Sequence, residues 1–369
     1  MMFGRRMKYV CAYFQMREYT MNEVNPLCQI LKILHRKPCS QVELCEQLGF
    51  SKSHMHKLVS NLVTPGIIKR SDSQEYEQEQ GRPRQKLTIT HNLQYRSVLV
   101  IHTSWKFRAY LLAYGLTEEI AYKDLPQTDS ASVFIKELND CIDEFTKLYL
   151  SDKKSILSIV IATQATIEQG ENGIMYRNNL LKDENITFAK KLREAIGIRC
   201  FVYNYAYGHM LSLLHAKDLN TDNAMVLSCG EGSVALGIFL NNQLLLGRNN
   251  SFPECSHLPF KYGFEKSLGE FGEHTKEALL FAINAIAPIY NINHVILAGS
   301  CFDNHLNIIY QASLELKEQK DPLLQKILLE YRGQEIEQHF LELVYLSFDS
   351  LVEVLNPQMQ KRNLEDLVK

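Results

Sequence analysis

This sequence lacks an uninterrupted apolar run of the roughly 20 residues that a membrane-spanning helix needs. Its first residues, MMFGRRMKYVCAYF, are basic and then briefly apolar. They have neither the sustained apolar segment nor the small-residue cleavage site of a secretory signal peptide. We therefore expect no membrane partner and a cytoplasmic protein.

Paired cysteine motifs are also lacking. The 9 cysteines are odd in number and scattered, and they include no Cys-x-x-Cys pair. Most of them stand in apolar stretches, where a free cysteine behaves as a small hydrophobic residue. This usage excludes a disulfide framework and is typical of a reducing compartment.

A strong net charge is a third absence, because the formal net charge is only −2 over 369 residues. With 46% hydrophobic and 22% charged residues, the composition is that of a globular protein, and the length predicts two or three domains. The charge is unevenly distributed. Residues 1–90 carry 14 Lys and Arg against 8 Asp and Glu, so the remaining chain carries a net charge of −8. A basic amino-terminal module on an acidic body indicates a regulator that presents one face to phosphate groups.

The segment 40–70 predicts two short helices joined by a tight turn. Ser40 and Ser51 stand where N-caps begin helices, and Gly49 supplies the turn between them. In the second helix the apolar positions share one side, while lysine, histidine and serine share the other. A Pro-Gly pair then ends the helix. This is the pattern of a helix-turn-helix, whose second helix enters the major groove of DNA.

The surrounding segments extend this motif to a winged helix. A helix over 23–37 is expected to pack beneath it, and two strands are expected at 67–68 and 87–89, separated by an acidic stretch and Gly-Arg-Pro-Arg. Arginines in such a wing contact phosphates or enter a narrow minor groove, although a solvated hairpin with incidental charge is the alternative. We expect DNA contacts from Ser51, Lys52, Ser53, His54, Lys57, Arg82 and Arg84.

Beyond this module, apolar strands alternate with amphipathic helices. Strands are expected at 97–104, 108–115, 155–163, 200–204, 294–299 and within 224–249, and helices at 128–150, 186–196, 205–219, 269–290, 304–317 and 334–354. The order repeats, so that apolar hairpin strands come first and alternating helices and strands follow. This predicts an α/β body with two similar lobes, in which ligands bind at the carboxyl ends of the strands.

In the order and spacing of its motifs, the sequence resembles the ROK family of repressors and sugar kinases over roughly residues 24–350. The resemblance rests on QGRPRQKLTIT, the Asn204 turn after a strand, CGEGSVALGIFLNNQLLLGRN, the PECSH box and HVILAG. It implies an α/β protein with an N-terminal winged helix-turn-helix, followed by a two-lobed actin-like ATPase (ribonuclease H-like, sugar-kinase) fold. The expected limits are an unassigned extension over 1–22, the winged helix over 23–91, the lobes over 92–204 and 205–330, and a C-terminal helix returning to the first lobe, with a tail, over 331–369.

The catalytic features that the resemblance implies are missing. ROK kinases open the body with an Asp-x-Gly-Gly-Thr phosphate loop, whereas the matching stretch Ile101–Lys106 reads IHTSWK and has neither the acidic residue nor the glycines. The family's catalytic base is the Asp of an Asn-Asp-Ala turn, which reads Asn204-Tyr205-Ala206 here. A tyrosine, with a pKa of about 10, cannot replace that carboxylate. We therefore expect no catalytic residue, no cofactor and no enzymatic activity.

The zinc site of the family is also incomplete. Its ligands are a His and the cysteines of a Cys-x-Cys-Gly-x-x-Gly-Cys segment. His257 remains in this sequence, but Phe260, Tyr262 and Ser267 stand at the cysteine positions. Because a structural zinc site needs four nitrogen or sulfur ligands, we expect no metal.

The sugar pocket of the family is half retained. Asn204, Glu254 and His257 match positions that bind sugar hydroxyls in relatives, and Glu270 falls one residue after a further glutamate of the family pattern. A carboxylate accepts hydrogen bonds and an imidazole donates or accepts them, so Glu254 and His257 can bind adjacent hydroxyls. The alternative is that these residues are a structural relic in a closed cleft.

Together these patterns predict a DNA-binding transcriptional regulator, best interpreted as a carbohydrate-responsive repressor. Its expected partners are a double-stranded DNA operator, a sugar or sugar-phosphate effector, and a second copy of the chain in a homodimer or higher homo-oligomer. One alternative keeps the DNA binding and makes the body a dimerisation or protein-partner scaffold. Another is a sugar kinase with an appended DNA-binding domain.

Overall fold

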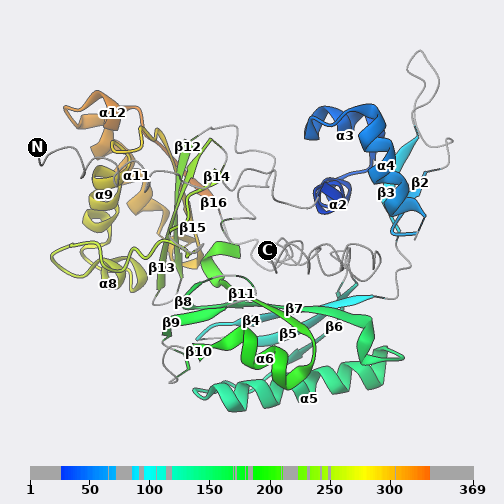
Figure 1. Cartoon of the computed structure of the whole chain (residues 1–369). Helices are drawn as coiled ribbons and strands as arrows, with labels where there is room; N and C mark the ends of the chain where they lie inside the picture. The colour runs from blue at the N-terminus through cyan, green and yellow to red at the C-terminus, as the bar shows by residue number, and fades with distance from the viewer. Residues whose placement is uncertain are drawn as a thin grey trace, which may run out of the picture. The chain divides into compact units, whose positions relative to one another are not determined.

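The structure is a computed structural model. It describes residues 26–332 except for 65, 72–84, 91–94, 105, 114–118, 169, 171–172, 179, 182–185, 209, 211–222, 231–232, 242, 248–250 and 304. The described residues divide into two compact units, with the division between Leu93 and Gln94. Figure 1 labels the elements of both, and each unit is described by itself. The domain limits expected from the sequence stay predictions, because 1–25 and 333–369 lie outside the described residues.

The first unit is a small winged helix. Its elements are α2 (Pro26–Arg36), β1 (Cys39–Ser40), α3 (Gln41–Leu48), α4 (Lys52–Val63), β2 (Ile68–Arg70) and β3 (Lys86–Ile89). The three helices pack on one another, and the strands form an antiparallel sheet in the order β1-β3-β2. Strand β1 has no counterpart in the sequence analysis, because two residues are too few to show a period.

Local capping signals explain the two central helices of this unit. Ser40 begins α3 with a complete capping box, in which its Oγ accepts the Glu43 N–H at 3.3 Å and its own N–H donates to Glu43 Oε2 at 2.6 Å. Gly49 ends the helix at φ +69°, a left-handed conformation that favours glycine. Ser51 caps α4 in turn, with its Oγ accepting the His54 N–H at 3.3 Å. The predicted helix-turn-helix is thus confirmed.

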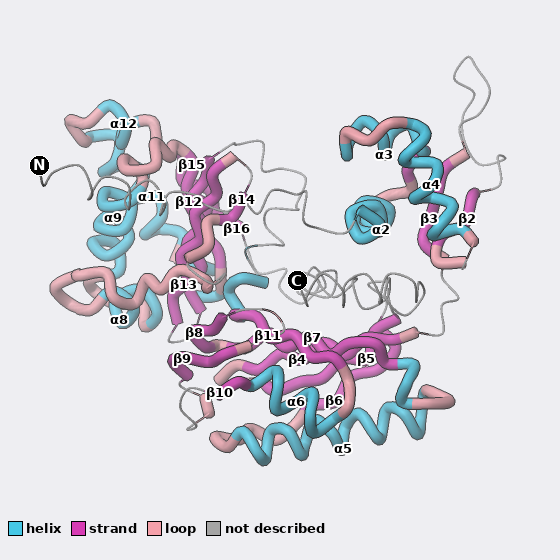
Figure 2. Tube along the Cα trace, viewed as in Figure 1, coloured by secondary structure: helices cyan, strands magenta, loops and turns pink. Residues whose placement is uncertain are grey.

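The first lobe of the second unit is a five-stranded sheet in the order β11-β7-β4-β5-β6. Its main elements are β4 (Arg96–His102), β5 (Phe107–Ala113), β6 (Glu119–Asp124), α5 (Ala131–Tyr149), β7 (Ile156–Thr163), α6 (Phe188–Ile196) and β11 (Arg199–Asn204). A smaller sheet adds β8 (Ala165–Glu168), β9 (Ile174–Asn178) and β10 (Ile186–Thr187). Figure 2 shows α5 and α6 covering one face of the main sheet. The buried core lies between these helices and that face.

The second lobe repeats the arrangement in the order β14-β13-β12-β15-β16. Its elements are β12 (Asn223–Gly230), β13 (Ser233–Leu240), β14 (Gln243–Leu244), α8 (Phe264–Gly269), α9 (Thr275–Ile286), β15 (His294–Ala298), α10 (Ser300–Asp303), α11 (Leu306–Glu318), α12 (Pro322–Gln325) and β16 (Leu328–Arg332). In both lobes three antiparallel strands are continued by two parallel ones. The predicted pair of similar α/β lobes is confirmed.

The long helix expected over 269–290 is wrong at its start. Helix α8 ends at Gly269, and α9 begins only at Thr275. Between them Phe271 adopts φ +45°, which an α-helix does not allow. The Thr275 Oγ1 donates to Ser267 O at 2.8 Å and accepts from Gly272 N at 2.8 Å, so it stabilises the break.

Three further differences concern element ends and edges. The helix expected from 186 begins at Phe188, because the two preceding residues pair with β9 as β10. Strands β6 and β16 were not predicted, and both stand at sheet edges with partly exposed residues. The expected helix at 334–354 lies outside the described residues. Among the residues the structure describes, no helix is long and apolar enough to cross a membrane.

Candidate nucleic-acid interface and ligand site

Helix α4 has two chemically different sides. Met55, Leu58, Val59 and Leu62 are buried against the rest of the unit. Five of the seven residues predicted to contact DNA belong to this helix and its N-cap, and all five are exposed: Ser51, Lys52, Ser53, His54 and Lys57. No acidic residue stands in the first turn of the helix, so its amino-terminal end is electropositive. The structure therefore places these five side chains where a duplex can reach them, while their contacts with DNA stay a prediction.

Two of these residues have defined local geometry. Ser51 Oγ already accepts a hydrogen bond as the N-cap, but its hydroxyl hydrogen can still donate to a phosphate. The His54 ring packs edge-on against Phe50, with ring centroids 5.1 Å apart. This contact restricts the His54 rotamer and therefore the direction in which its ring nitrogens can read a base edge.

The wing is only partly within the described residues. Arg82 and Arg84 lie outside them, so their predicted DNA contacts are untested. Strand β2, at the base of the wing, exposes Lys69 and Arg70, which the sequence analysis did not single out. The sequence does contain a signal for these two residues, because they are basic and directly follow two isoleucines at the start of a strand.

The candidate ligand site is built on the segment that follows β7. The Gln164 N–H donates to His102 O at the end of β4, 3.2 Å away. Asn204, the last residue of β11, donates from Nδ2 to Ala165 O at 2.8 Å. Thr166 Oγ1 lies 3.1 Å from Glu254 Oε2 in the second lobe. Two of the four predicted ligand residues therefore contact neighbouring residues of this segment. Asn204 binds Ala165, and Glu254 binds Thr166.

The other two predicted ligand residues, His257 and Glu270, are exposed and follow Glu254 in the chain. His257 stands three residues after Glu254, in a turn closed by a hydrogen bond from Leu258 N to Cys255 O at 3.0 Å. Glu270 is the exposed C-cap of α8. Glu254 itself is exposed, and its Oε1 accepts the Ser256 N–H at 3.1 Å. The ligand contacts of all four residues stay predictions.

The turn between β4 and β5 is not shaped to cradle a phosphate. The Thr103 N–H donates to Lys106 O at 2.7 Å, and the Lys106 N–H donates to Thr103 Oγ1 at 3.0 Å. The Ser104 N–H donates to Gln164 Oε1 at 3.0 Å. A phosphate loop needs free backbone N–H groups that converge on the anion, and these three are already used.

Tyr205 stands where kinases of the resembled family have their base. Burial raises the pKa of its phenol to about 12, so it holds its proton at neutral pH. A protonated phenol can donate a hydrogen bond but cannot take a proton from a sugar hydroxyl.

The residues around Cys255 do not fit a zinc ion. The Cys255 thiol is buried, which raises its pKa to about 12, and it donates to Val234 O at 3.4 Å. Phe260 packs against Phe281 with centroids 5.5 Å apart, and Tyr262 stacks on His274 at 3.5 Å. In the part of the chain that is described, no group of three or more His, Cys, Asp and Glu could hold a metal. Aromatic packing occupies the place of the ligand set.

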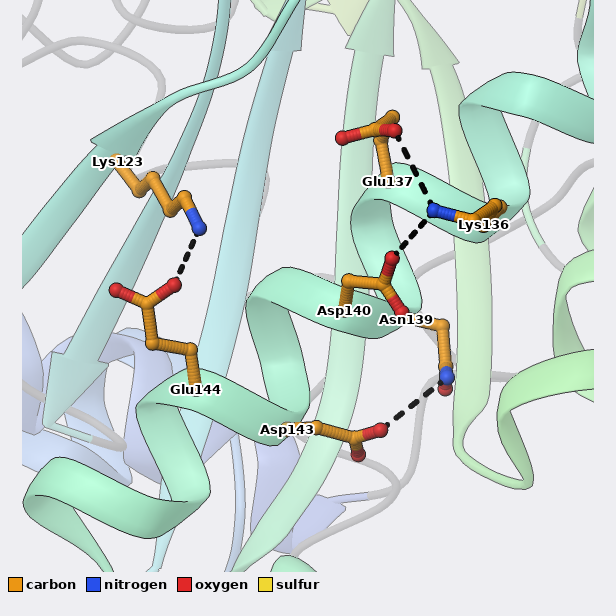
Figure 3. Close-up of polar contacts among 7 residues, drawn as sticks. All are labelled: Lys123, Lys136, Glu137, Asn139, Asp140, Asp143 and Glu144. Carbon is orange, nitrogen blue, oxygen red and sulfur yellow. Dashed lines mark hydrogen bonds and ion pairs between the residues drawn. The ribbon is translucent and has the colours of Figure 1, made fainter.

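On α5, charged and polar side chains pair with one another and with Lys123 of β6 (Figure 3). Lys136 binds Asp140 at 2.8 Å, Asn139 donates to Asp143 at 3.3 Å, and Lys123 of β6 pairs with Glu144. Solvent screens exposed pairs of this kind, so they contribute little to stability. Because acidic and basic groups alternate here, we do not assign this face to DNA binding.

Residues 115–275 match the family model described as the ROK family. The DNA-binding transcriptional dual regulator NagC of Escherichia coli strain K12 is 21% identical over 245 residues, which cover 64% of this chain and 57% of that protein. The N-acetylglucosamine repressor of Shigella flexneri matches with the same identity and coverage. The chain thus matches 57% of the length of these curated relatives.

Solved structures with the same fold include regulators and kinases. A ROK family transcriptional regulator, described as a homologue of the Escherichia coli MLC protein, has a TM-score of 0.70 at 17% identity and covers 89% of this chain and 97% of its own. A ROK family glucokinase from Streptomyces griseus, in complex with glucose and AMPPNP, has a TM-score of 0.50 at 11% identity and covers 68% and 97%. At these identities the likeness shows the fold, and the predicted two-lobed fold is confirmed.

Proposed function

We propose that the chain is a DNA-binding transcriptional regulator that represses genes in response to a carbohydrate, and the match of residues 115–275 to the ROK family model supports this. The observation that carries this proposal is α4, which buries its apolar side and exposes serine, lysine and histidine on the other. The curated relatives named as regulators and repressors support it. Such a protein acts in the cytoplasm, where the chromosome is.

The proposed mechanism uses two copies of the chain. A homodimer, or a higher homo-oligomer, spaces two winged helices so that they bind half-sites about 34–36 Å apart, or multiples of this. A sugar or sugar phosphate bound at Glu254 changes the spacing of the helices and releases the operator. This requires that the ligand binds the two conformations unequally.

The DNA contact is tested at Lys57. Replacing it with alanine is expected to weaken operator and non-specific binding alike, and to reduce the slope of log K against log salt by about 1, because one phosphate contact is lost. Fluorescence anisotropy titrations between low and moderate salt measure both quantities. Substitutions of Ser53 or His54 are expected to change base preference instead.

Two comparisons make this experiment decisive. Lys147→Ala removes an exposed lysine from the last turn of α5, so it should leave affinity and salt slope at wild-type values. Arg84→Ala is expected to behave like Lys57→Ala. If only Arg84→Ala leaves the salt slope unchanged, the wing contact is wrong and the helix contact stands.

The effector is tested at Glu254. Glu254→Gln keeps the size of the side chain but removes its charge, and hydrogen bonds to a charged group contribute about 1.5–3 kcal/mol. Sugar affinity is therefore expected to fall about tenfold or more, and the effect of sugar on operator binding should fall with it. Calorimetry with a panel of sugars and sugar phosphates measures the first, and an operator titration the second. The matched control is Glu273→Gln, an exposed glutamate beyond α8.

Two other functions remain distinct outcomes of these measurements. If no sugar gives heat with the wild type, the body is a dimerisation or protein-partner scaffold, which the contact of Glu254 with Thr166 favours. If the protein transfers phosphate to a sugar, it is a kinase with a DNA-binding module. We propose that it has no kinase activity, because the turn donors are occupied and Tyr205 keeps its proton.

A further inference from the structure

The segment Gln164–Thr166 is fixed to the first lobe from both sides. The backbone N–H of Gln164, its first residue, donates a hydrogen bond to His102 O at the end of β4. Its middle residue, Ala165, is buried and holds the Asn204 side chain at the end of β11. Because these two hydrogen bonds hold the segment at the carboxyl edge of the first sheet, a shift of its side chains also shifts that edge.

The two flanking side chains of the segment reach the second lobe. Gln164 is a bend residue between β7 and β8, Thr166 lies in β8, and both are partly exposed around the buried Ala165. Thr166 Oγ1 meets Glu254 Oε2 at 3.1 Å. Gln164 Nε2 lies 3.4 Å from Ser233 Oγ, at the first residue of β13. Both contacts join residues that are far apart in the chain.

The orientation of the Gln164 amide follows from its neighbours. The Ser104 N–H can only donate, so the atom 3.0 Å away must be the amide oxygen. The amide nitrogen then faces Ser233, whose hydroxyl can accept. A single side chain thus connects the β4–β5 turn of the first lobe with the start of β13 in the second.

We propose that Gln164 and Thr166 form an interlobe clasp, and that Thr166 stands in for a ligand hydroxyl at Glu254. Without ligand, the clasp holds the two lobes together through one amide and one hydroxyl. A ligand hydroxyl that takes Glu254 Oε2 displaces Thr166 and loosens the clasp. This second part rests on the proposed function, because it requires an effector with hydroxyl groups.

Hydrogen exchange on the full chain without ligand tests the clasp itself. Ser233→Ala removes the second-lobe partner, and its expected effect is about five- to tenfold faster exchange of the Ser104 amide, which Ser233 does not contact, since a hydrogen bond of this kind is worth about 1 kcal/mol. Gln164→Ala should accelerate exchange both at Ser104 and in the peptide 228–236. The control is Gln127→Ala, which removes a bond to Thr103 O (3.1 Å) within the first lobe and should affect only that turn.

The outcomes separate the clasp from the effector. If Ser233→Ala leaves Ser104 exchange unchanged, or Gln164→Ala changes only the first-lobe turn, there is no clasp. For the ligand part, Thr166→Val keeps the side-chain shape without the hydroxyl and is expected to raise sugar affinity about fivefold or more, because the Thr166 hydroxyl no longer competes for Glu254 Oε2. Weaker sugar binding by Thr166→Val overturns the competition. If the wild type binds no sugar at all, the effector proposal fails while the exchange result still decides the clasp.

Discussion

Gly299→Ala is expected to lower the free energy of unfolding of the body by about 4 kcal/mol or more, among the largest effects of a single substitution. Gly299 follows β15 at φ +98°, and an added Cβ would lie 2.2 Å from Cys229 O and 2.8 Å from Cys229 C. These atoms belong to the backbone of β12, which cannot move without disturbing its pairing with β13 and β15. Denaturant unfolding followed by circular dichroism measures the loss.

Gly170→Ala is the matched control for this clash. Gly170 has nearly the same backbone angle, φ +96°, but within the described part of the chain no heavy atom lies within 4 Å of an added Cβ. Alanine at 170 is therefore expected to lower the free energy of unfolding only by the backbone strain of a positive φ, about 1–3 kcal/mol. If the two variants unfold at the same denaturant concentration, close approach to Cys229 is not what requires glycine at 299.

The second large effect is expected on acidification. His102 is fully buried in the first lobe, where its ring packs edge-on against Phe107 and Phe134 with centroids 5.1 and 4.9 Å away. Its Nδ1 lies 3.1 Å from Thr163 Oγ1, while Nε2 has no hydrogen-bond partner among the described residues. Burial lowers the pKa of the imidazole from 6.5 to about 4, because no group compensates the charged form.

The sign of the pH dependence follows from this lowered pKa. Between pH 6.5 and about 4 the unfolded chain binds a proton at His102 that the folded chain does not, so stability falls as the pH falls through this window. With about 1.36 kcal/mol for each pKa unit, the loss approaches about 3 kcal/mol. Above pH 6.5 the residue is neutral in both states and contributes no pH dependence.

Denaturant unfolding at pH 7 and pH 5 measures this contribution. Trp105, the single tryptophan of the chain, follows His102 closely in the sequence and provides a fluorescence signal for the first lobe. His102→Phe keeps an aromatic ring but removes the titrating group, so the difference between the two pH values should shrink by about 2 kcal/mol, because about 1.5 pKa units of the window lie between pH 6.5 and pH 5. A His102→Phe variant with the full wild-type pH dependence would show that other groups cause it.

Much of the candidate DNA-binding surface could be predicted from the sequence because its signals are local. An N-cap acts within three residues, as with Ser51 and His54, and the alternation of buried and exposed positions along α4 repeats every turn. The contribution of β2 was missed for a different reason. The sequence predicted a strand only at 67–68, whereas β2 continues to Arg70, so Lys69 and Arg70 follow the buried Ile68 as exposed strand residues.

The sequence by itself determined the helix-turn-helix and the two α/β lobes, though not the edge strands β6 and β16, because hydrophobic period and capping act over a few neighbouring residues. Only the tertiary structure decided which residues contact one another at the candidate ligand site. Gln164 and Ser104 are 60 residues apart in the chain, and Thr166 and Glu254 are 88 apart. Contacts over such separations depend on the packing of whole sheets, which no residue pattern records. The same packing placed β12 against Gly299 and buried His102, whose Nε2 has no hydrogen-bond partner among the residues that the structure describes.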